Sequence, residues 1–403
     1  MCTKNATLLK LFCLDGLFLD HMDIREHIID VFARSPRTHA RCPHCEKTTT
    51  RVHRNAKRTV KHMQCDGKLV QLQLTMRNFL CQSCKHIFRE TIAGIDRRRT
   101  TQHYRAYIVP KVRDRSFRSV AHEHQVGTGT LINATTALMG EHDITWPQIP
   151  FTLGLDGHSF RGRDLMMTVT DVTHHRLLTL LPDDRMASLR AFLTNMPEIA
   201  KKLLTSVTID MHAGYRAVVG DVLPKIPVVI DRFHVISYLN QELSDMRLVF
   251  TSRKDPLPKQ LFEKNKEVLT GAERAQLKRI FRSYPAIGEL WRIKEIMRRI
   301  YRYRDPQEAR RHYQSLVDGL AGDTRPRFAA LYRTLKRWRD DILNYHTHRI
   351  TNGYTEGVHT RIKLLKRISY GFRNKTNYIA KMTLAFLPLA ALIELIKTSP
   401  SLT

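Results

Sequence analysis

Three acidic residues stand at the ends or starts of segments with different patterns. Asp156 ends the run Phe-Thr-Leu-Gly-Leu-Asp, Asp210 ends Ser-Val-Thr-Ile-Asp, and Glu356 lies in Asn-Gly-Tyr-Thr-Glu-Gly before a basic helical stretch. An apolar run that stops at a carboxylate is typical of a buried strand that delivers an acid to a sheet edge. Mg²⁺ and Mn²⁺ prefer such oxygen ligands, and a two-metal site can cut or join phosphodiesters. The three acids therefore predict metal-dependent chemistry on phosphate esters.

The charge of the chain points to the same substrate class. Its 403 residues include 67 Lys and Arg against 38 Asp and Glu, which gives a net charge of +29. Such a surplus favours a polyanionic partner, because neutralising phosphates releases condensed counterions. A solvated basic surface or an anionic membrane is the alternative explanation. With the acids considered, we expect double-stranded DNA as the partner.

Two apolar stretches bear on the location of the protein. Residues 8–19 are interrupted by a lysine, an aspartate and a glycine, so they do not resemble a signal peptide. Residues 384–396 contain Pro388 and Glu394 and are too short to span a bilayer. We therefore expect no membrane association and a cytoplasmic, nucleoid-associated protein.

Two Cys-x-x-Cys pairs lie in the first region of the chain, residues 1–95. Cys42 and Cys45 form one pair, and Cys81 and Cys84 form the other. Two such pairs can supply four thiolates to a tetrahedral Zn²⁺. Buried thiols or a redox pair are the alternatives, but in a chain without an export signal metal is favoured over disulfides. We expect a zinc-binding domain in which the metal is structural, with a strand over residues 69–76.

The next region, residues 96–145, is basic and helical. It begins with Arg97, Arg98 and Arg99 and continues with a helix in which Tyr104, Tyr107 and Ile108 share one face. Two short helices then flank a Gly-containing turn, and the residues expected to face inward are Val120, Ala121, Val126 and Leu131. This pattern fits a helix-turn-helix, with an ordinary helical hairpin as the alternative. The second helix would present to the major groove Thr128, Thr130 and Asn133.

Residues 150–236 alternate short apolar strands with helices. The expected order is three strands, a helix, a strand ending at Asp210, a helix, and a strand ending at Asp231. That order matches a ribonuclease H-like sheet, in which the first and fourth strands are neighbours. Asp156 and Asp210 would then face one metal-binding notch. Glu356 would approach from a helix that follows an all-helical insertion, residues 237–350, and residues 351–397 would complete the catalytic core.

Asp231 competes with Asp210 for the second acidic position. It also ends an apolar strand, and His234 lies one helical turn beyond it. We prefer Asp210 on strand order, and Asp231 and His234 would then brace the site from outside the first layer of ligands. Beyond Glu356, Lys363 and Arg367 recur on the same helix face and are expected to contact phosphate.

Taken together, these segments resemble transposases of the ISL3 insertion-sequence family over nearly the whole chain. The supporting segments are the cysteine pairs, the basic run with its helix-turn-helix, Ile209-Asp-Met-His-Ala-Gly-Tyr, Asp231-Arg-Phe-His-Val, Asn352-Gly-Tyr-Thr-Glu-Gly, Ile362-Lys-Leu-Leu-Lys-Arg and Gly371-Phe-Arg-Asn. The resemblance implies a DDE triad carried by Asp156, Asp210 and Glu356, with a helical insertion before the glutamate. One departure is Gly157-His158, where an acidic or apolar pair is more usual.

The fold class expected is a multidomain α+β and α/β protein with a zinc module, a helix-turn-helix and a ribonuclease H-like domain. We expect a transposase that binds terminal inverted repeats and uses Mg²⁺ or Mn²⁺ for DNA cleavage and strand transfer, as a homodimer or higher oligomer on DNA. One alternative is a DNA-binding regulator derived from a transposase. Another is a ribonuclease H-like nuclease or resolvase without strand transfer.

Overall fold

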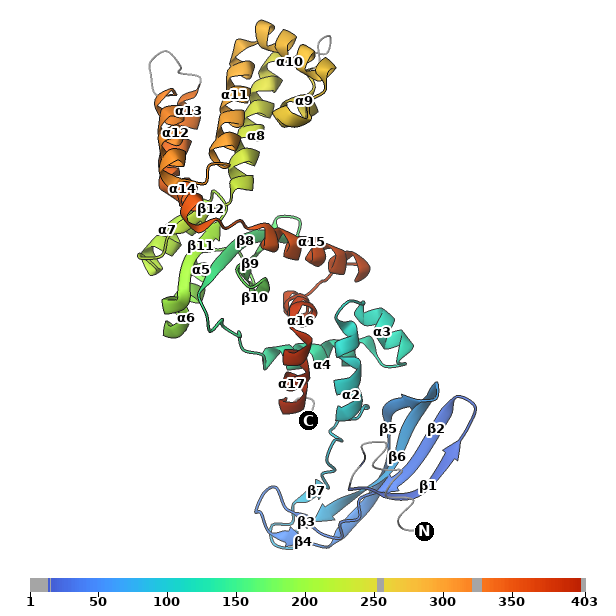
Figure 1. The fold of residues 1–403 in the computed structure, drawn as a ribbon. Coiled ribbons are helices and arrows are strands. Elements are labelled where there is room, and N and C mark those ends of the chain that lie inside the picture. Colours follow the sequence, from blue (N-terminus) through green and yellow to red (C-terminus); the bar gives the residue numbers. More distant parts are fainter. Residues whose placement is uncertain (1–13, 15, 252–256, 321–327, 400–403) are drawn as a thin grey trace. The chain divides into compact units, whose positions relative to one another are not determined.

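The computed structural model describes residues 14, 16–251, 257–320 and 328–399. It divides the chain into two compact units (Figure 1). The first unit comprises Met1–Asp143 and Ile362–Thr403, and the second comprises Ile144–Arg361. Most of the apolar stretch 8–19, and parts of the predicted helical insertion at 252–256 and 321–327, lie outside the described residues.

The first unit begins with a twisted sheet of long strands (Figure 1). Its strand order is β1-β2-β6-β5, with β7 pairing to β6; β2 and β6 are parallel and the other pairs antiparallel. The strands are β1 (Phe18–Ile24), β2 (Ile28–Arg34), β5 (Val52–Cys65), β6 (Lys68–Leu80) and β7 (Ile87–Arg89), and a separate small hairpin is made by β3 (Ala40–Arg41) and β4 (Thr48–Thr49). Strand β6 alternates buried apolar with partly exposed residues, which confirms the predicted strand at 69–76.

Helices follow this sheet in the first unit. They are α2 (Gln102–Ile108), the short 3₁₀ turn η1 (Pro110–Val112), α3 (Phe117–Glu123), α4 (Thr128–Gly140), α16 (Lys375–Phe386) and α17 (Leu389–Thr398). Thr101 and Ser116 cap α2 and α3 with their hydroxyls. Apolar residues of α2, α3 and α4 share one core with Ala380, Leu384 and Leu392. The C-terminal helices therefore pack on α2, α3 and α4.

The buried Lys381 of α16 anchors this packing. Its ammonium group donates to the backbone carbonyls of Val112, Arg113 and Arg115, the last two at 3.0 and 2.9 Å. A buried ammonium is tolerated only with such partners, because an unpaired buried charge is strongly unfavourable. These contacts also place residues 362–397 in the first unit, whereas the sequence prediction assigned residues 351–397 to the catalytic core.

The second unit is built on a five-stranded mixed sheet in the order β10-β9-β8-β11-β12 (Figure 1). The strands are β8 (Phe151–Arg161), β9 (Asp164–Asp171), β10 (Arg176–Leu181), β11 (Leu204–Ile209) and β12 (Val228–Ile230). β8, β9 and β10 pair antiparallel, whereas β11 is parallel to both β8 and β12. The predicted succession of strands and the adjacency of the first and fourth strands are thus both present.

The helices between these strands are shorter than expected. They are α5 (Met186–Thr194), α6 (Glu198–Leu203) and α7 (Ala213–Val222). The single helix expected before the strand that ends at Asp210 is two helices, α5 and α6, because Pro197 starts α6 and proline fits the start of a helix but not its interior. Strand β8 also differs from the prediction. It continues five residues past Asp156, to Arg161, so this acid lies within the strand and does not end it.

Between β12 and Glu356 the chain is helical, as predicted (Figure 1). The elements are α8 (Arg232–Phe250), α9 (Lys259–Glu263), the turn η2 (Lys266–Val268), α10 (Gly271–Ser283), α11 (Pro285–Ile300), α12 (Pro306–Asp318), α13 (Ala329–Arg337) and α14 (Arg339–His348). The first of these begins at Arg232, before the predicted start at residue 237. Leu290, Ile293, Met297 and Ile300 on α11 are all buried, in agreement with their helical spacing. The insertion and the sheet share one apolar core.

The predicted face of α2 with Tyr104, Tyr107 and Ile108 is only partly buried. Tyr104 and Ile108 are fully buried, but Tyr107 is 46% exposed. Lys111 lies over its ring, with the ammonium 4.5 Å from the ring centroid. Tyr107 thus belongs to the surface, where an aromatic ring and a cation attract each other.

Gly154 offers a test of how closely the elements of the second unit are packed. A Cβ at this position would lie 2.4 Å from Thr170 Oγ1, 2.6 Å from Val172 Cγ2 and 2.8 Å from Asn352 Oδ1. We expect Gly154→Ala to lower the free energy of unfolding by roughly 1–3 kcal/mol, the usual cost of overpacking. Gly220 in α7 has open space at its Cβ position, so Gly220→Ala is the matched control and should be neutral or stabilising by up to about 1 kcal/mol. Equal thermal stability of the two variants would contradict this account of the packing.

Candidate functional site

Four acidic side chains and one histidine meet on the second unit. Asp156 lies in β8, Asp210 follows β11 directly, and Asp231 follows β12 directly. His234 lies in the first turn of α8, and Glu356 lies in the first turn of α15 (Gly353–Ile368). β8, β11 and β12 are consecutive in the sheet, and β11 is parallel to both neighbours. Their acids therefore lie side by side, at the carboxyl ends of β11 and β12.

The ligand atoms of these residues form two overlapping groups. One group contains Asp156, Asp210 and His234, and the other contains Asp231, His234 and Glu356. Within each group, one ligand atom from each residue lies within 4.8 Å of those from the others. His234 belongs to both, and its Nε2 lies 2.8 Å from Oδ1 of Asp210. Donor atoms at this separation can converge on a divalent cation.

The proximity of these carboxylates changes their ionisation. Burial, together with the charge of Asp210, raises the pKa of Asp156 to about 7. Burial and the charge of Asp231 also raise the pKa of Glu356. Like charges held close together in a partly buried site disfavour full ionisation. A positive charge at this site would relieve the repulsion, and this is the electrostatic setting of a metal site.

The same acids act on His234. Burial opposes its charged form, but the contact with Asp210 and the charges of Asp210, Asp156 and Asp231 outweigh burial and raise the pKa of His234. The surrounding acids therefore favour the charged form of the imidazole.

Asp210 and Asp231 differ in their environments. The Asp210 side chain is 28% exposed, whereas Asp231 is buried. Asp231 caps α8, since its carboxylate accepts from the backbone N–H of Phe233 at 3.3 Å. Burial raises the pKa of Asp231, and a hydrogen bond from the Asn352 backbone partly opposes that rise. One carboxylate is thus accessible beside Asp156, and the other is engaged by the backbone.

Helix α15 is docked on the sheet by polar side chains. Thr355 Oγ1 lies 2.7 Å from Thr170 Oγ1 of β9, and both threonines are fully buried. Gly154 leaves the space that the Asn352 side chain fills just before the helix. These contacts fix the position of the first turn of α15 relative to the sheet, and Glu356 lies in that turn.

The sequence analysis missed two histidines beside Asp156. His359 and His158 are both buried, and Nδ1 of His359 lies 3.4 Å from Oδ2 of Asp156. Their positions in the sequence carried the signal. His158 is two residues after Asp156, on the same face of the strand, and His359 is three residues after Glu356, on the same face of the helix.

The four predicted zinc ligands lie together in the first unit. Cys42 Sγ is 3.6 Å from Cys84 Sγ, and Cys45 Sγ is 3.5 Å from Cys81 Sγ. All four sulfurs lie within 4.8 Å of one another. A tetrahedral ion with Zn–S bonds of about 2.3 Å needs sulfurs about 3.8 Å apart, so the set fits the metal. A backbone hydrogen bond at Cys84 lowers the pKa of Cys81 to about 6 and favours its thiolate, whereas burial and the neighbouring cysteines raise the pKa of Cys84 to about 12.

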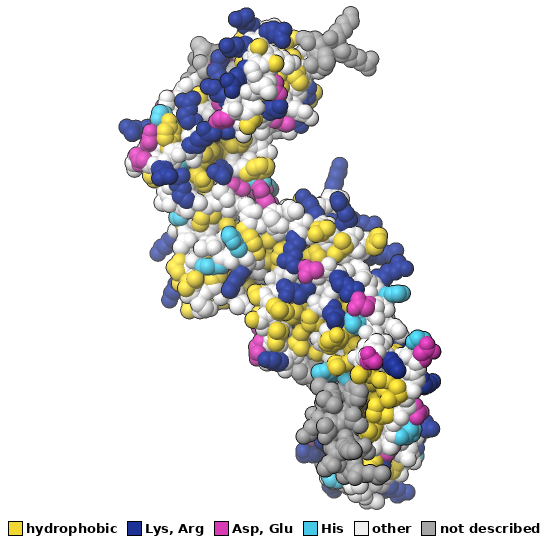
Figure 2. All heavy atoms as spheres, turned by 45° about the vertical axis from the view of Figure 1, so that its right-hand side comes forward, with side chains coloured by type: hydrophobic (Ala, Val, Ile, Leu, Met, Phe, Trp, Pro, Cys, Tyr) yellow, Lys and Arg dark blue, Asp and Glu magenta, His cyan; other side chains and the backbone are white. Residues whose placement is uncertain are grey.

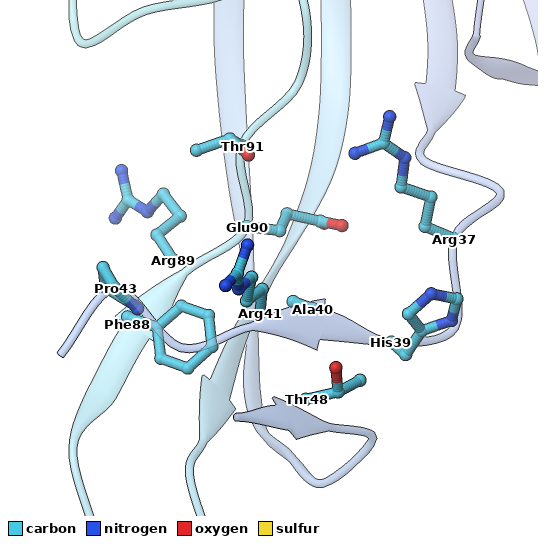
Figure 3. Close-up of a pocket in the computed structure, with 10 residues that line it drawn as sticks. All are labelled: Arg37, His39, Ala40, Arg41, Pro43, Thr48, Phe88, Arg89, Glu90 and Thr91. Atoms are coloured by element: carbon cyan, nitrogen blue, oxygen red, sulfur yellow. The ribbon is translucent and has the colours of Figure 1, made fainter. Parts of the chain in front are cut away.

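A basic hollow of about 380 Å³ lies next to this cluster (Figure 3). Arg37, Arg41 and Arg89 surround it together with His39 and the ring of Phe88. Arg41 is paired to Glu46 at 2.7 Å. The part of the chain that carries the four cysteines therefore also gathers positive charge at its surface.

The predicted DNA-binding residues of the helical region are accessible. Helices α3 and α4 are joined by residues 124–127, and Val120, Ala121 and Leu131 are buried between them, with Val126 partly buried. Thr128 and Asn133 on α4 are exposed, and Thr130 is partly exposed. The pair has the connectivity of a helix-turn-helix, and the candidate base-reading residues are not engaged in its core.

The arginine run 97–99 lies alongside β5. The Lys61 backbone N–H donates to the Arg99 carbonyl at 2.9 Å, and the Thr101 N–H donates to the Lys61 carbonyl at 3.0 Å. All three arginine residues are exposed, and Arg97 and Arg99 line a recess with Arg58 and Lys61. This arrangement fixes the backbone of the run and leaves the guanidinium groups at the surface.

Lys363 and Arg367 are exposed residues of α15. They belong to the first unit, whereas Glu356 belongs to the second. Their contact with phosphate beside the acids stays a prediction.

Positive charge is spread over both units. Lys and Arg side chains are distributed over the visible face, with fewer acidic side chains between them (Figure 2). Among the described residues, every helix is too short or too polar to cross a membrane.

Comparisons with known proteins identify the family. The model of the ISL3 family of DDE transposases, whose description reads "Transposase", matches residues 153–382, which is more than half of the chain. The chain is 21% identical over 359 residues to the transposase for insertion sequence element IS1001 from Bordetella parapertussis, covering 86% of this chain and 88% of that protein. It is 25% identical over 269 residues to the transposase for IS1557 from Mycobacterium tuberculosis (strain CDC 1551 / Oshkosh), covering 59% and 60%. The chain belongs to the ISL3 family of transposases.

Proposed function

We propose that the chain binds the terminal inverted repeats of an insertion sequence and cuts and joins DNA through a DDE triad of Asp156, Asp210 and Glu356. The family implies a DNA substrate and a DNA-cutting or DNA-transferring enzyme in general. The observation that carries the finer proposal is the meeting of these acids, from three separate elements, around His234. The order β10-β9-β8-β11-β12 supports assigning the catalytic core to the ribonuclease H-like fold.

The residues present fit divalent cations. Asp156 with Asp210 would hold one ion, and Glu356 would hold the other, with His234 and Asp231 beside it. Carboxylate oxygens are the ligands that Mg²⁺ and Mn²⁺ prefer. Two such ions, when bound, activate water or a DNA 3′-hydroxyl for in-line attack on phosphorus and stabilise the leaving oxygen. The acids also create the negative field that attracts the cations to a chain whose net charge is +29.

We assign the second position of the triad to Asp210. It is more exposed than Asp231 and shares a group with Asp156, the first acid. Asp231 is buried and caps α8, so its carboxylate already serves the fold. Asp231 and His234 then brace the site, His234 through its 2.8 Å contact with Asp210.

We propose that the first unit finds the DNA ends. In this scheme residues 1–95 form the zinc-binding domain and residues 96–145 the helix-turn-helix, and Thr128, Thr130 and Asn133 read base edges. Arg97, Arg98 and Arg99 contact phosphates, which raises affinity without reading sequence. Residues 150–236 and 351–361 form the catalytic core around the helical insertion. Because two DNA ends must be joined in one event, the active form is at least a dimer.

The triad is tested by removing each acid in turn. We expect Asp156→Ala, Asp210→Ala and Glu356→Ala each to reduce cleavage of end-containing DNA by more than roughly 1,000-fold, the scale seen when members of a catalytic unit are lost. Binding of the DNA ends, measured by gel shift, should stay unchanged because the proposed reading residues are intact. Asp231→Ala is the comparison: it removes a helix cap and should lower stability by about 1 kcal/mol. Cleavage that survives in Asp210→Ala but not in Asp231→Ala would exchange their roles.

A strand-transfer assay with Mg²⁺ or Mn²⁺ separates a transposase from a nuclease.

Base reading and phosphate contact have different signatures in binding. We expect Asn133→Ala to weaken binding to end DNA by about 5- to 150-fold, since a bidentate base contact contributes about 1–3 kcal/mol, with little effect on unrelated DNA. Arg97→Ala should weaken binding to both DNAs equally and reduce the dependence of affinity on salt. Fluorescence anisotropy at several salt concentrations measures both effects. An Asn133→Ala variant that binds both DNAs equally more weakly would argue against base reading by α4.

The zinc assignment is tested by metal content. We expect one Zn²⁺ per purified chain by elemental analysis, and its loss together with the fold of the module in Cys81→Ser. Cys65 is exposed and lies outside the cluster, so Cys65→Ser is the control and should keep the metal. Zinc retained at full occupancy in Cys81→Ser would refute the four-thiolate site.

A further inference from the structure

A line of three buried side chains connects α15 to the sheet directly beside Asp156. His359 Nε2 lies 2.8 Å from Thr168 Oγ1, and that oxygen lies 2.8 Å from His158 Nδ1. At the near end, His359 Nδ1 lies 3.4 Å from Asp156 Oδ2. All four residues are no more than 9% exposed. The three side chains therefore connect α15 to β9 and then to β8 through a region that solvent does not reach.

The donors and acceptors in this line follow from its chemistry. An ionised carboxylate only accepts, so a favourable contact with Asp156 requires the proton of His359 on Nδ1. In the neutral ring Nε2 then accepts, and the Thr168 hydroxyl donates to it. The Thr168 oxygen is left to accept from Nδ1–H of His158. Thr168 then donates to His359 and accepts from His158, so the line is satisfied when His359 carries its proton on Nδ1.

We propose that His359 is a positioning residue for Asp156: its Nδ1–H holds one carboxylate oxygen and leaves the other for the cation shared with Asp210. The inference rests on the proposed function, because it takes Asp156 as a metal ligand. At 3.4 Å the contact is longer than an ordinary hydrogen bond. Contacts of this kind are often long in ligand-free sites and tighten in the reacting complex.

Docking of the helix alone does not account for these residues. The Thr355–Thr170 contact and the fully buried Asn352 already hold the first turn of α15 on the sheet. An apolar side chain at 359 would serve docking equally well and would avoid burying polar atoms. Apolar residues cannot supply a directed hydrogen-bond donor that faces Asp156. The need for this donor explains the pair of histidines.

The placement of His359 also couples two members of the triad. It lies three residues after Glu356, so one face of α15 carries both the third acid and the brace of the first. A shift of α15 along the sheet would therefore move Glu356 and release Asp156 together. The geometry of both cation-binding groups depends on how this helix is seated.

Two amide substitutions test the roles of the two ring nitrogens of His359 separately. An asparagine amide lies near the Nδ1 position and keeps a donor toward Asp156, whereas a glutamine amide reaches the Nε2 position and keeps only the Thr168 partner. The measurement is the rate of cleavage of end-containing DNA by the full chain, as a function of Mn²⁺ concentration. We expect His359→Gln to lose about 10- to 100-fold at low Mn²⁺ and to need more Mn²⁺ for half-maximal rate, the range found for residues that orient metal ligands. His359→Asn should stay near the wild type.

Thr168 provides an independent pair of variants. Thr168→Val removes the hydroxyl with little change of shape and should shift the Mn²⁺ requirement in the same direction as His359→Gln. Thr168→Ser keeps the hydroxyl and should not shift it. Thermal unfolding of every variant without added Mn²⁺ reports any loss of stability separately from the metal requirement.

Three outcomes distinguish this inference from the proposed function. Cleavage by Asp156→Ala at the wild-type rate overturns the proposed function and this inference with it. An inactive Asp156→Ala with a wild-type Mn²⁺ requirement in both His359→Gln and Thr168→Val overturns the positioning role alone. Equal losses in His359→Asn and His359→Gln, matched by equal losses of thermal stability, assign the histidine to packing and also overturn the positioning role.

Discussion

The repulsion among four carboxylates held around one imidazole is the constraint that organises the second unit. Asp156, Asp210, Asp231 and Glu356 come from different elements, and the folded chain must hold them together against their charge. Burial and the neighbouring carboxylates raise the pKa values of Asp156, Asp231 and Glu356, and the same carboxylates raise the pKa of His234. A site of this kind lowers the stability of the free protein and is relieved when cations bind. The electrostatic arrangement that lowers the stability of the free protein therefore also raises its affinity for cations.

Holding such a site requires a support that is rigid without being wholly apolar. Buried threonines of the sheet supply it: Thr168 and Thr170 project from β9 and bond to side chains of α15. A hydroxyl can donate and accept at once, so a buried polar layer of threonines and histidines can be satisfied internally. Gly154 leaves room beside these threonines for the Asn352 side chain, whose own amide atoms are buried without a hydrogen-bond partner among the described residues. The helix that carries Glu356 thus sits at a defined position on the sheet, which apolar packing alone would fix less specifically.

The sequence predicted those features that depend on local pattern. Strand order followed from alternating apolar runs, and the meeting of Asp156 with Asp210 followed from strand order. The cysteine cluster followed from the spacing of two pairs. What could not be predicted depends on contacts distant in the chain. The packing of α16 on α4 unites residues about 240 positions apart, and Asn377 of α16 lies 3.3 Å from Thr136 of α4. The extension of β8 past Asp156 arises from pairing with β9, which no pattern within 151–156 contains.

The helical insertion is anchored at the acids themselves. Its first helix, α8, is capped by Asp231, and its end leads into Asn352, whose backbone bonds to the same Asp231. Further along, the Asn344 side chain of α14 donates to the Val228 carbonyl of β12 at 2.8 Å, and Arg216 of α7 pairs with Asp341 at 2.9 Å. Both ends of the insertion thus close on one carboxylate, that of Asp231. The insertion therefore meets the acid cluster through Asp231, which caps its first helix, and through His234, which lies in that helix.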